Sequence, residues 1–217
     1  MIISNKLQFM FFAVPKTATH AIRFAVRKYL DNTTDWEQVG LFVQKKLPFP
    51  ALAQLDTGHI TATEAKLVLD EALWKQFFKF AVVRNPYDRF VSFCAFMNRE
   101  NLAFQQHALS IMKATIANPD IQQRILFRPQ HEFLCDSDDN LLLDFVAHYE
   151  HLQDDYTHIC THIGIRVDTL PRINRSVHHA YTSYYDEELR MAVLQFYKKD
   201  FELFGYPETF QTDEIHS

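Results

Sequence analysis

The chain has 217 residues, of which 47% are hydrophobic and 14% aromatic, and it contains 20 Phe but only 4 Gly. A typical chain of this length carries about 15 Gly, because glycine makes up roughly 7% of protein sequences. No two of these glycines stand close enough for a G-x-G-x-x-G or a G-x-x-x-x-G-K-[ST] loop, which excludes both glycine-rich phosphate loops. Any phosphate site must therefore use another kind of loop.

The charge is close to balance, since 22 Lys and Arg against 27 Asp and Glu give a net charge of −5. The sequence contains no basic run long enough to indicate nucleic-acid binding. Cys94, Cys135 and Cys160 lack a C-x-x-C spacing, which argues against a disulfide framework and a zinc site. The apolar run at residues 9–14 is too short for a membrane span or a signal peptide. We expect one domain over residues 1–217, soluble and cytoplasmic, and the oligomeric state stays open.

Two strand-turn-helix units are predicted in the first half of the chain. Leu7–Val14 is a continuous apolar run that ends at a proline, which is typical of a strand buried on both faces of a parallel sheet. Apolar residues at helical spacing over 22–30 predict an amphipathic helix, so PKTATH at 15–20 is a strand-to-helix turn. Phe78–Val83 predicts the second strand, and Asn85-Pro86 is an N-cap followed by proline at the first helical position.

Helices are expected over most of the remaining chain. Thr61 and Glu64 form a capping box, and the helix that they start is expected to run to about Trp74. A third strand is expected in Asp144–Tyr149. Further helices are predicted over 99–117, over 150–163 with Gly164 as the stop, and over 187–204, with loops at Asn118-Pro119 and Arg128-Pro129.

Each of the two turns carries a basic residue, Lys16 in the first and Arg84 in the second. Such turns lie at the carboxyl ends of parallel strands, where ligands bind, and the following helix offers N–H groups to an anion. Taken alone, either residue could instead be structural, as a solvated turn lysine or as an arginine that bonds loop carbonyls. Two such turns side by side predict a site for two phosphates.

Two segments resemble sequence motifs of one enzyme family. FAVPKTATHAIR resembles the 5′-phosphosulfate loop of the sulfotransferases that use 3′-phosphoadenosine 5′-phosphosulfate, and VVRNPYDRFVSFCAF resembles their 3′-phosphate motif. The second match is the more specific, because it fixes Arg84, Asn85, Pro86, Arg89 and Ser92 in the pattern R-[ND]-P-x-x-R-x-x-S. A weaker resemblance continues through RPQHEFLCD, HYEHLQDDY and KKDFELFGY. The most similar subgroup is the carbohydrate branch, which includes heparan sulfate 2-O-sulfotransferase-like and small bacterial members.

The resemblance implies a three-layer α/β fold of the P-loop-kinase-like sulfotransferase type, with a short parallel sheet flanked by helices. It also implies transfer of a sulfuryl group from 3′-phosphoadenosine 5′-phosphosulfate to an acceptor hydroxyl, with a saccharide as the expected acceptor and adenosine 3′,5′-bisphosphate as the product. Lys16 would neutralise the bridging oxygen of the phosphosulfate. The residues implied to bind the donor are Lys16, Thr17, Ala18, Thr19, His20, Arg84 and Ser92.

The phosphosulfate loop departs from the family pattern at two positions. His20 and Ala21 stand where the family has hydroxyl residues, so one side-chain contact is lost or is taken over by the imidazole. The backbone N–H groups of residues 17–20 can still hold the 5′-phosphate, and the hydroxyls of Thr17 and Thr19 are expected to contribute.

The acceptor hydroxyl needs a base, for which His59 is the first candidate. It lies where heparan sulfate 2-O-sulfotransferase relatives carry an H-G-H segment, of which Gly58-His59 matches and Thr57 replaces the first histidine. A neutral imidazole near pH 7 suits a general base. His59 could instead bind the acceptor without proton transfer or be a loop histidine bonded to backbone. Glu64 and His20 are the alternative bases.

A metal site is not expected, although the chain has 11 His. His158 and His162 are four residues apart on a predicted helix but lack the glutamate of H-E-x-x-H, and His178-His179 point apart in regular structure. The loop Pro171–Tyr185, with Arg172, Arg175 and Ser176, could close over the nucleotide and line an acceptor cleft. It could equally be a surface loop that packs its tyrosines on the core.

Two other functions stay open at this point. An ATP-dependent kinase could use the same fold, but the G-x-x-x-x-G-K-[ST] loop is missing and no acidic magnesium ligand follows a strand. A non-catalytic protein could keep the nucleotide pocket without transfer, which the unusual His20-Ala21 pair favours.

Overall fold

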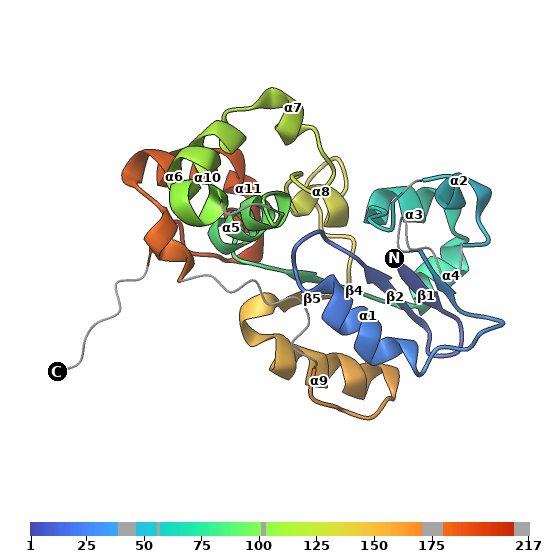
Figure 1. Cartoon of the computed structure of the whole chain (residues 1–217). Coiled ribbons are helices and arrows are strands. Elements are labelled where there is room, and N and C mark those ends of the chain that lie inside the picture. Colours follow the sequence, from blue (N-terminus) through green and yellow to red (C-terminus); the bar gives the residue numbers. More distant parts are fainter. Residues whose placement is uncertain (39–46, 56, 101–102, 171–179, 211–217) are drawn as a thin grey trace. The chain divides into compact units, whose positions relative to one another are not determined.

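The structure is a computed structural model that describes residues 1–38, 47–55, 57–100, 103–170 and 180–210. The chain divides into two compact units, unit 1 with residues 1–84 and 130–175 and unit 2 with residues 85–129 and 176–217 (Figure 1). The expectation of a single domain over the whole chain stays a prediction. No helix in the described part of the chain is long and apolar enough to cross a membrane.

Unit 1 is built on a five-stranded mixed sheet with the strand order β3-β1-β2-β4-β5. The strands are β1 (Ile2–Ser4), β2 (Phe9–Phe12), β3 (Trp36–Glu37), β4 (Phe78–Val83) and β5 (Phe145–His148). The predicted strands β2, β4 and β5 are parallel neighbours, whereas β1 is antiparallel to both β2 and β3. The sheet thus has a parallel core and an antiparallel edge, rather than being wholly parallel. The antiparallel strands β1 and β3 were missed because two or three residues are too few for a periodic pattern.

The register of the parallel strands determines which loops lie together. Phe12 of β2 pairs with Ala81 of β4, and Val83 of β4 pairs with His148 of β5. All three strands therefore end at the same edge of the sheet. The residues that directly follow them are neighbours there, although they lie far apart in sequence.

Helices cover both faces of this sheet. α1 (Thr19–Arg27) and α9 (Leu152–Ile163) pack on one face against phenylalanines that include Phe9 and Phe80 (Figure 1). On the other face, Trp74 of α4 (Glu71–Gln76) meets Phe12 edge-on, with ring centroids 6.2 Å apart. Unit 1 therefore has the three-layer α/β fold that was predicted, with the Phe-rich strands at its centre.

The predicted helix from Thr61 to Trp74 is in fact two helices. The capping box is confirmed, since Thr61 and Glu64 exchange both of its hydrogen bonds at the start of α3 (Ala62–Val68). Leu69 is extended, and Asp70 caps α4 by accepting from two backbone N–H groups. A second N-cap residue thus ends the first helix early. Unit 1 also contains the short helices α2 (Pro50–Ala53) and α8 (His131–Leu134), and the 3₁₀ turn η2 (Tyr149–His151).

Unit 2 is helical, with an aromatic core around Phe127 and Tyr197. Its elements are α5 (Pro86–Met97), α6 (Ala103–Ile116), α7 (Pro119–Gln122), η3 (Tyr181–Tyr184), α10 (Glu187–Phe196) and α11 (Lys198–Phe204). The helix expected over 187–204 breaks at Tyr197, whose hydroxyl donates to the Phe127 carbonyl at 2.8 Å. The expected loop at Asn118-Pro119 is a helical turn, because Asn118 caps it.

Candidate functional site

The turn from β2 into α1 has a backbone that non-glycine residues rarely adopt. Lys16 and Ala18 both lie in the left-handed region, with φ of 68° and 64°. Such a conformation costs on the order of 1–3 kcal/mol per residue and needs support from its surroundings. The hydroxyls of Thr17 and Thr19 supply that support by donating to the Val14 carbonyl at 3.0 and 2.8 Å. Threonine side chains thus hold a tight turn in which glycine is absent.

In this turn the side-chain hydroxyls and the backbone N–H groups have different roles. A hydroxyl has one proton, and those of Thr17 and Thr19 point at Val14, so their expected contacts with a 5′-phosphate stay a prediction. The first hydrogen bond of α1 runs from the Ala21 N–H to the Ala18 carbonyl at 2.9 Å. The N–H groups of the first helical turn precede this bond and are the donors that a helix N-terminus offers to an anion.

Arg84 lies beside this turn, as the prediction of two adjacent basic turns requires. It follows β4 at the same sheet edge, and its Nη1 donates to the Lys16 carbonyl at 3.4 Å. Arg84 thus bonds a loop carbonyl, which is the structural role that was considered for it. The contact also puts the guanidinium charge next to the turn PKTATH at 15–20, here named the phosphate loop for its resemblance to the family motif.

Two residues that the motifs did not single out hold Arg84 in place. The side-chain amide of the fully buried Gln130 bonds both backbone groups of Arg84, each at 2.9 Å. The Arg84 guanidinium carbon lies 4.1 Å from the ring centroid of Tyr149, a cation–π contact. Gln130 lies in the segment RPQHEFLCD and Tyr149 in HYEHLQDDY. The weak family resemblance of these segments was the signal in the sequence that could have indicated them.

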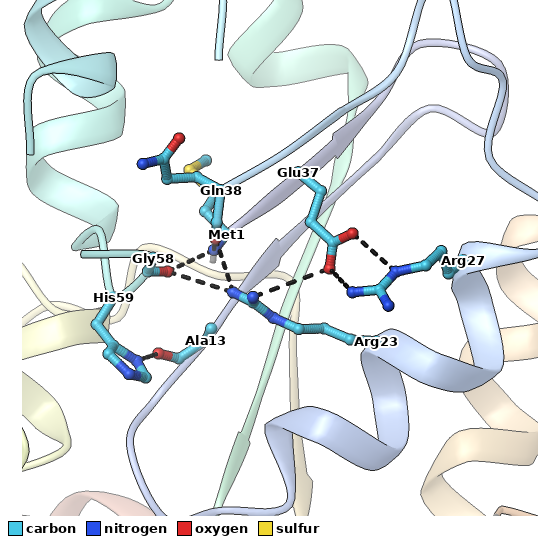
Figure 2. A network of polar contacts seen from close by, with 8 residues as sticks. All are labelled: Met1, Ala13, Arg23, Arg27, Glu37, Gln38, Gly58 and His59. Carbon is cyan, nitrogen blue, oxygen red and sulfur yellow. Dashed lines mark hydrogen bonds and ion pairs between the residues drawn. The ribbon is translucent and has the colours of Figure 1, made fainter. Parts of the chain in front are cut away.

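His59 is bonded to the strand end that leads into the phosphate loop. Its Nδ1 lies 2.5 Å from the carbonyl oxygen of Ala13, three residues before Lys16 (Figure 2). A carbonyl oxygen can only accept, so Nδ1 carries the proton. In the neutral ring Nε2 then holds the lone pair, which is the form that a general base requires.

The other two candidate bases have different surroundings. The Glu64 carboxylate accepts from the N–H and the hydroxyl of Thr61, both at 2.8 Å. Its role in capping α3 explains the position of this carboxylate without a role in proton transfer. Desolvation, followed by the positive charges of Arg23 and Lys16, lowers the pKa of His20 below its usual value of 6.5. The lowered pKa favours the neutral form of the His20 imidazole at pH 7.

The remaining residues of the 3′-phosphate motif lie in unit 2. Asn85 caps α5 as predicted, by accepting from the Tyr87 N–H at 3.0 Å. Arg89 is buried and donates to the Arg128 carbonyl at 2.8 Å, which makes it a structural arginine. Ser92 is buried on α5, and its contact with a 3′-phosphate stays a prediction.

The histidines of α9 pack on the sheet. The His162 ring stacks on Phe78 with centroids 3.8 Å apart, and the His158 ring lies 4.6 Å from that of Phe145. Among the residues that the structure describes, no group of three or more His, Cys, Asp or Glu could hold a metal ion.

The loop predicted over 171–185 is described only from Ala180 onward. Its tyrosines pack against the core of unit 2, as in the surface-loop interpretation, and the Tyr185 hydroxyl donates to the Tyr87 carbonyl at 2.8 Å. Arg172, Arg175, Ser176 and His178-His179 lie outside the described residues.

A parallel-core α/β sheet that carries a strand-to-helix turn, a lysine and a neighbouring arginine at its carboxyl edge has the arrangement in which α/β proteins commonly bind anions. The model of the sulfotransferase family matches residues 1–207 of this chain. The chain therefore belongs to the sulfotransferase family, as its two motifs predicted. It is an enzyme, and its family implies sulfuryl transfer from 3′-phosphoadenosine 5′-phosphosulfate. Searches of the curated proteins and of the solved structures found no match.

Proposed function

We propose that this protein transfers a sulfuryl group from 3′-phosphoadenosine 5′-phosphosulfate to a hydroxyl group of a saccharide. The observation that carries the proposal is the contact between Arg84 and the Lys16 carbonyl, which brings the two basic turns to one edge of the sheet. The donor has two phosphate positions, which call for two neighbouring cationic sites. The resemblance of Gly58-His59 to the 2-O-sulfotransferase branch supports a saccharide as the acceptor.

Each donor-binding residue has a distinct role in this proposal. The N–H groups of residues 17–20 hold the 5′-phosphate, and Arg84 binds the 3′-phosphate. The resemblance of the motif implies Ser92 as a second ligand of the 3′-phosphate. Lys16 neutralises the charge that develops on the bridging oxygen as its bond to sulfur breaks. Like phosphoryl transfer, this reaction depends on in-line positioning and on charge stabilisation more than on covalent chemistry by the protein.

His59 acts as the general base in this mechanism. Its Nε2 takes the proton of the acceptor hydroxyl as the oxygen attacks sulfur. The Ala13 carbonyl, which accepts from Nδ1, holds the ring in the required tautomer and stabilises the imidazolium that forms. The proximity of Ala13 to the phosphate loop supports this role, because it ties the base to the strand that positions Lys16.

Ligand-induced thermal stabilisation tests the donor class. At 100 times its Kd, adenosine 3′,5′-bisphosphate is expected to stabilise the protein by about 2.7 kcal/mol, which raises Tm by about 5–10 °C for a chain of this size. ATP with magnesium should give a clearly smaller shift. A larger shift with ATP would favour a kinase. Bisphosphate binding without sulfuryl transfer to any of a broad panel of saccharides and other hydroxyl compounds would favour a non-catalytic binder.

Replacing His59 tests the base. His59→Ala is expected to lower kcat by about 10²–10⁴-fold, the range of general-base catalysis, while the Kd for the bisphosphate changes by less than about threefold. Glu64→Gln is the matched control, because glutamine can keep the capping box but cannot act as a base. Steady-state transfer kinetics give kcat, and calorimetry gives the Kd. Loss of activity in Glu64→Gln with full activity in His59→Ala would assign the base to Glu64.

A further inference from the structure

A buried arginine connects the helix of the phosphate loop to the segment that carries His59. Arg23 lies in the middle of α1, and only 5% of it is exposed. Its Nη2 donates to the carbonyl oxygens of Gln38 at 2.9 Å and Gly58 at 3.5 Å (Figure 2). Gly58 directly precedes His59, so the guanidinium holds the backbone from which the imidazole extends.

Glu37 is the charged partner of this arginine and is itself 4% exposed. Its Oε1 lies 3.8 Å from Arg23 Nη1, and Arg27 binds both of its carboxylate oxygens at 2.8 and 2.9 Å. Desolvation lowers the pKa of Arg23 from 12.5 to about 10, against the attraction of Glu37. Arg23 therefore keeps its positive charge at neutral pH.

Burying the Arg23 guanidinium is unfavourable for the free energy of folding. Among the residues that the structure describes, its Nε has no hydrogen-bond partner, and a buried charged group with an unpaired N–H loses hydration without full compensation. The backbone nitrogen of Met1 also contacts the carbonyls of Gln38 and Gly58 (Figure 2). Both carbonyls thus keep a donor when the guanidinium is removed, so an Arg23 variant can retain the fold.

We propose that Arg23 is a positioning residue that acts on catalysis through His59. The inference rests on the proposed role of His59 as the base. The Nδ1 bond to Ala13 holds the imidazole ring, and the Gly58 carbonyl in the preceding backbone is held jointly by Arg23 and the Met1 nitrogen. Met1 alone leaves this backbone tied to the N-terminus, whereas Arg23 ties it to α1. Because a misplacement of about 1 Å can cost about 10²-fold in rate, losing the tie to α1 lowers kcat without removing any group that touches the substrates.

Matched substitutions on α1 test this role. Arg23→Met is expected to lower kcat by about 10–100-fold, with a Kd for adenosine 3′,5′-bisphosphate within about threefold of the unaltered protein. Arg27→Met is the control, since Arg27 shares the Glu37 partner and directs its guanidinium to that carboxylate rather than to the Gly58 carbonyl. It should change kcat by less than about threefold. An unchanged kcat in Arg23→Met, or an equal loss in Arg27→Met, would overturn the proposal.

A double-mutant cycle separates this inference from the assignment of the base. If Arg23 acts through His59, adding Arg23→Met to His59→Ala causes no further loss of kcat. Losses that multiply would show that Arg23 acts independently and would overturn the positioning role. Full activity in His59→Ala would instead overturn the base itself. If Arg23→Met lowers Tm too far for assay, Arg23→Lys enters the same cycle, because it keeps the buried charge but shortens the reach to Gly58.

Discussion

Lys16→Ala is expected to abolish sulfuryl transfer at ordinary enzyme concentrations, because kcat falls by about 10³-fold to a residual rate that only single-turnover assays detect. The ammonium group is proposed to neutralise the bridging oxygen only as charge builds up there, so its loss falls on the transition state more than on donor binding. The Kd for adenosine 3′,5′-bisphosphate should therefore rise by no more than about tenfold. Single-turnover transfer assays and calorimetry on the same preparation measure the two effects.

The loop itself should survive this substitution. Lys16 and alanine both carry a Cβ, so the left-handed backbone at this position is no more strained in the variant. The contact with Arg84 uses the carbonyl of Lys16, which the substitution leaves in place. Lys28→Ala is the matched control, because Lys28 lies at the other end of α1 and pairs with Asp168. Full transfer activity in Lys16→Ala would contradict the mechanism.

Arg84→Ala is expected to remove the preference of the protein for a nucleotide with a 3′-phosphate. Charged hydrogen bonds to phosphate contribute about 1.5–3 kcal/mol, so the Kd for adenosine 3′,5′-bisphosphate should rise by about 10–100-fold. Adenosine 5′-phosphate lacks the group that Arg84 is proposed to bind, and its Kd should change much less. Calorimetry with both nucleotides gives the comparison, and donor KM should rise with little change in kcat at saturation.

The stacking partner of Arg84 offers graded controls. Tyr149→Phe keeps the ring face under the guanidinium and should leave the bisphosphate Kd unchanged. Tyr149→Leu removes the cation–π contact and should weaken binding by about two- to tenfold. If Arg84→Ala retained the preference for the 3′-phosphate, Arg84 would have only the structural role of bonding the Lys16 carbonyl.

Local sequence patterns predicted the central elements of the fold. β2, β4 and β5 are continuous apolar runs because both faces of a parallel core are buried, and α1 and α9 have apolar stripes that pack on that core. The same reasoning failed where one residue overrides a periodic pattern. Asp70 starts a new helix through its side chain, and Tyr197 leaves the helical conformation while its hydroxyl bonds Phe127. The short antiparallel strands β1 and β3 gave no periodic signal.

The sequence by itself determined the chemistry of the two turns. Lys16 and Arg84 follow apolar strands and precede helices, and this local order is enough to predict anion sites without glycine. Only the tertiary structure decided how these groups are held. The bonds of His59 to Ala13 and of Gln130 to Arg84 each join residues 46 positions apart. Such contacts depend on which strands are neighbours and on their register, and local residue patterns do not encode either.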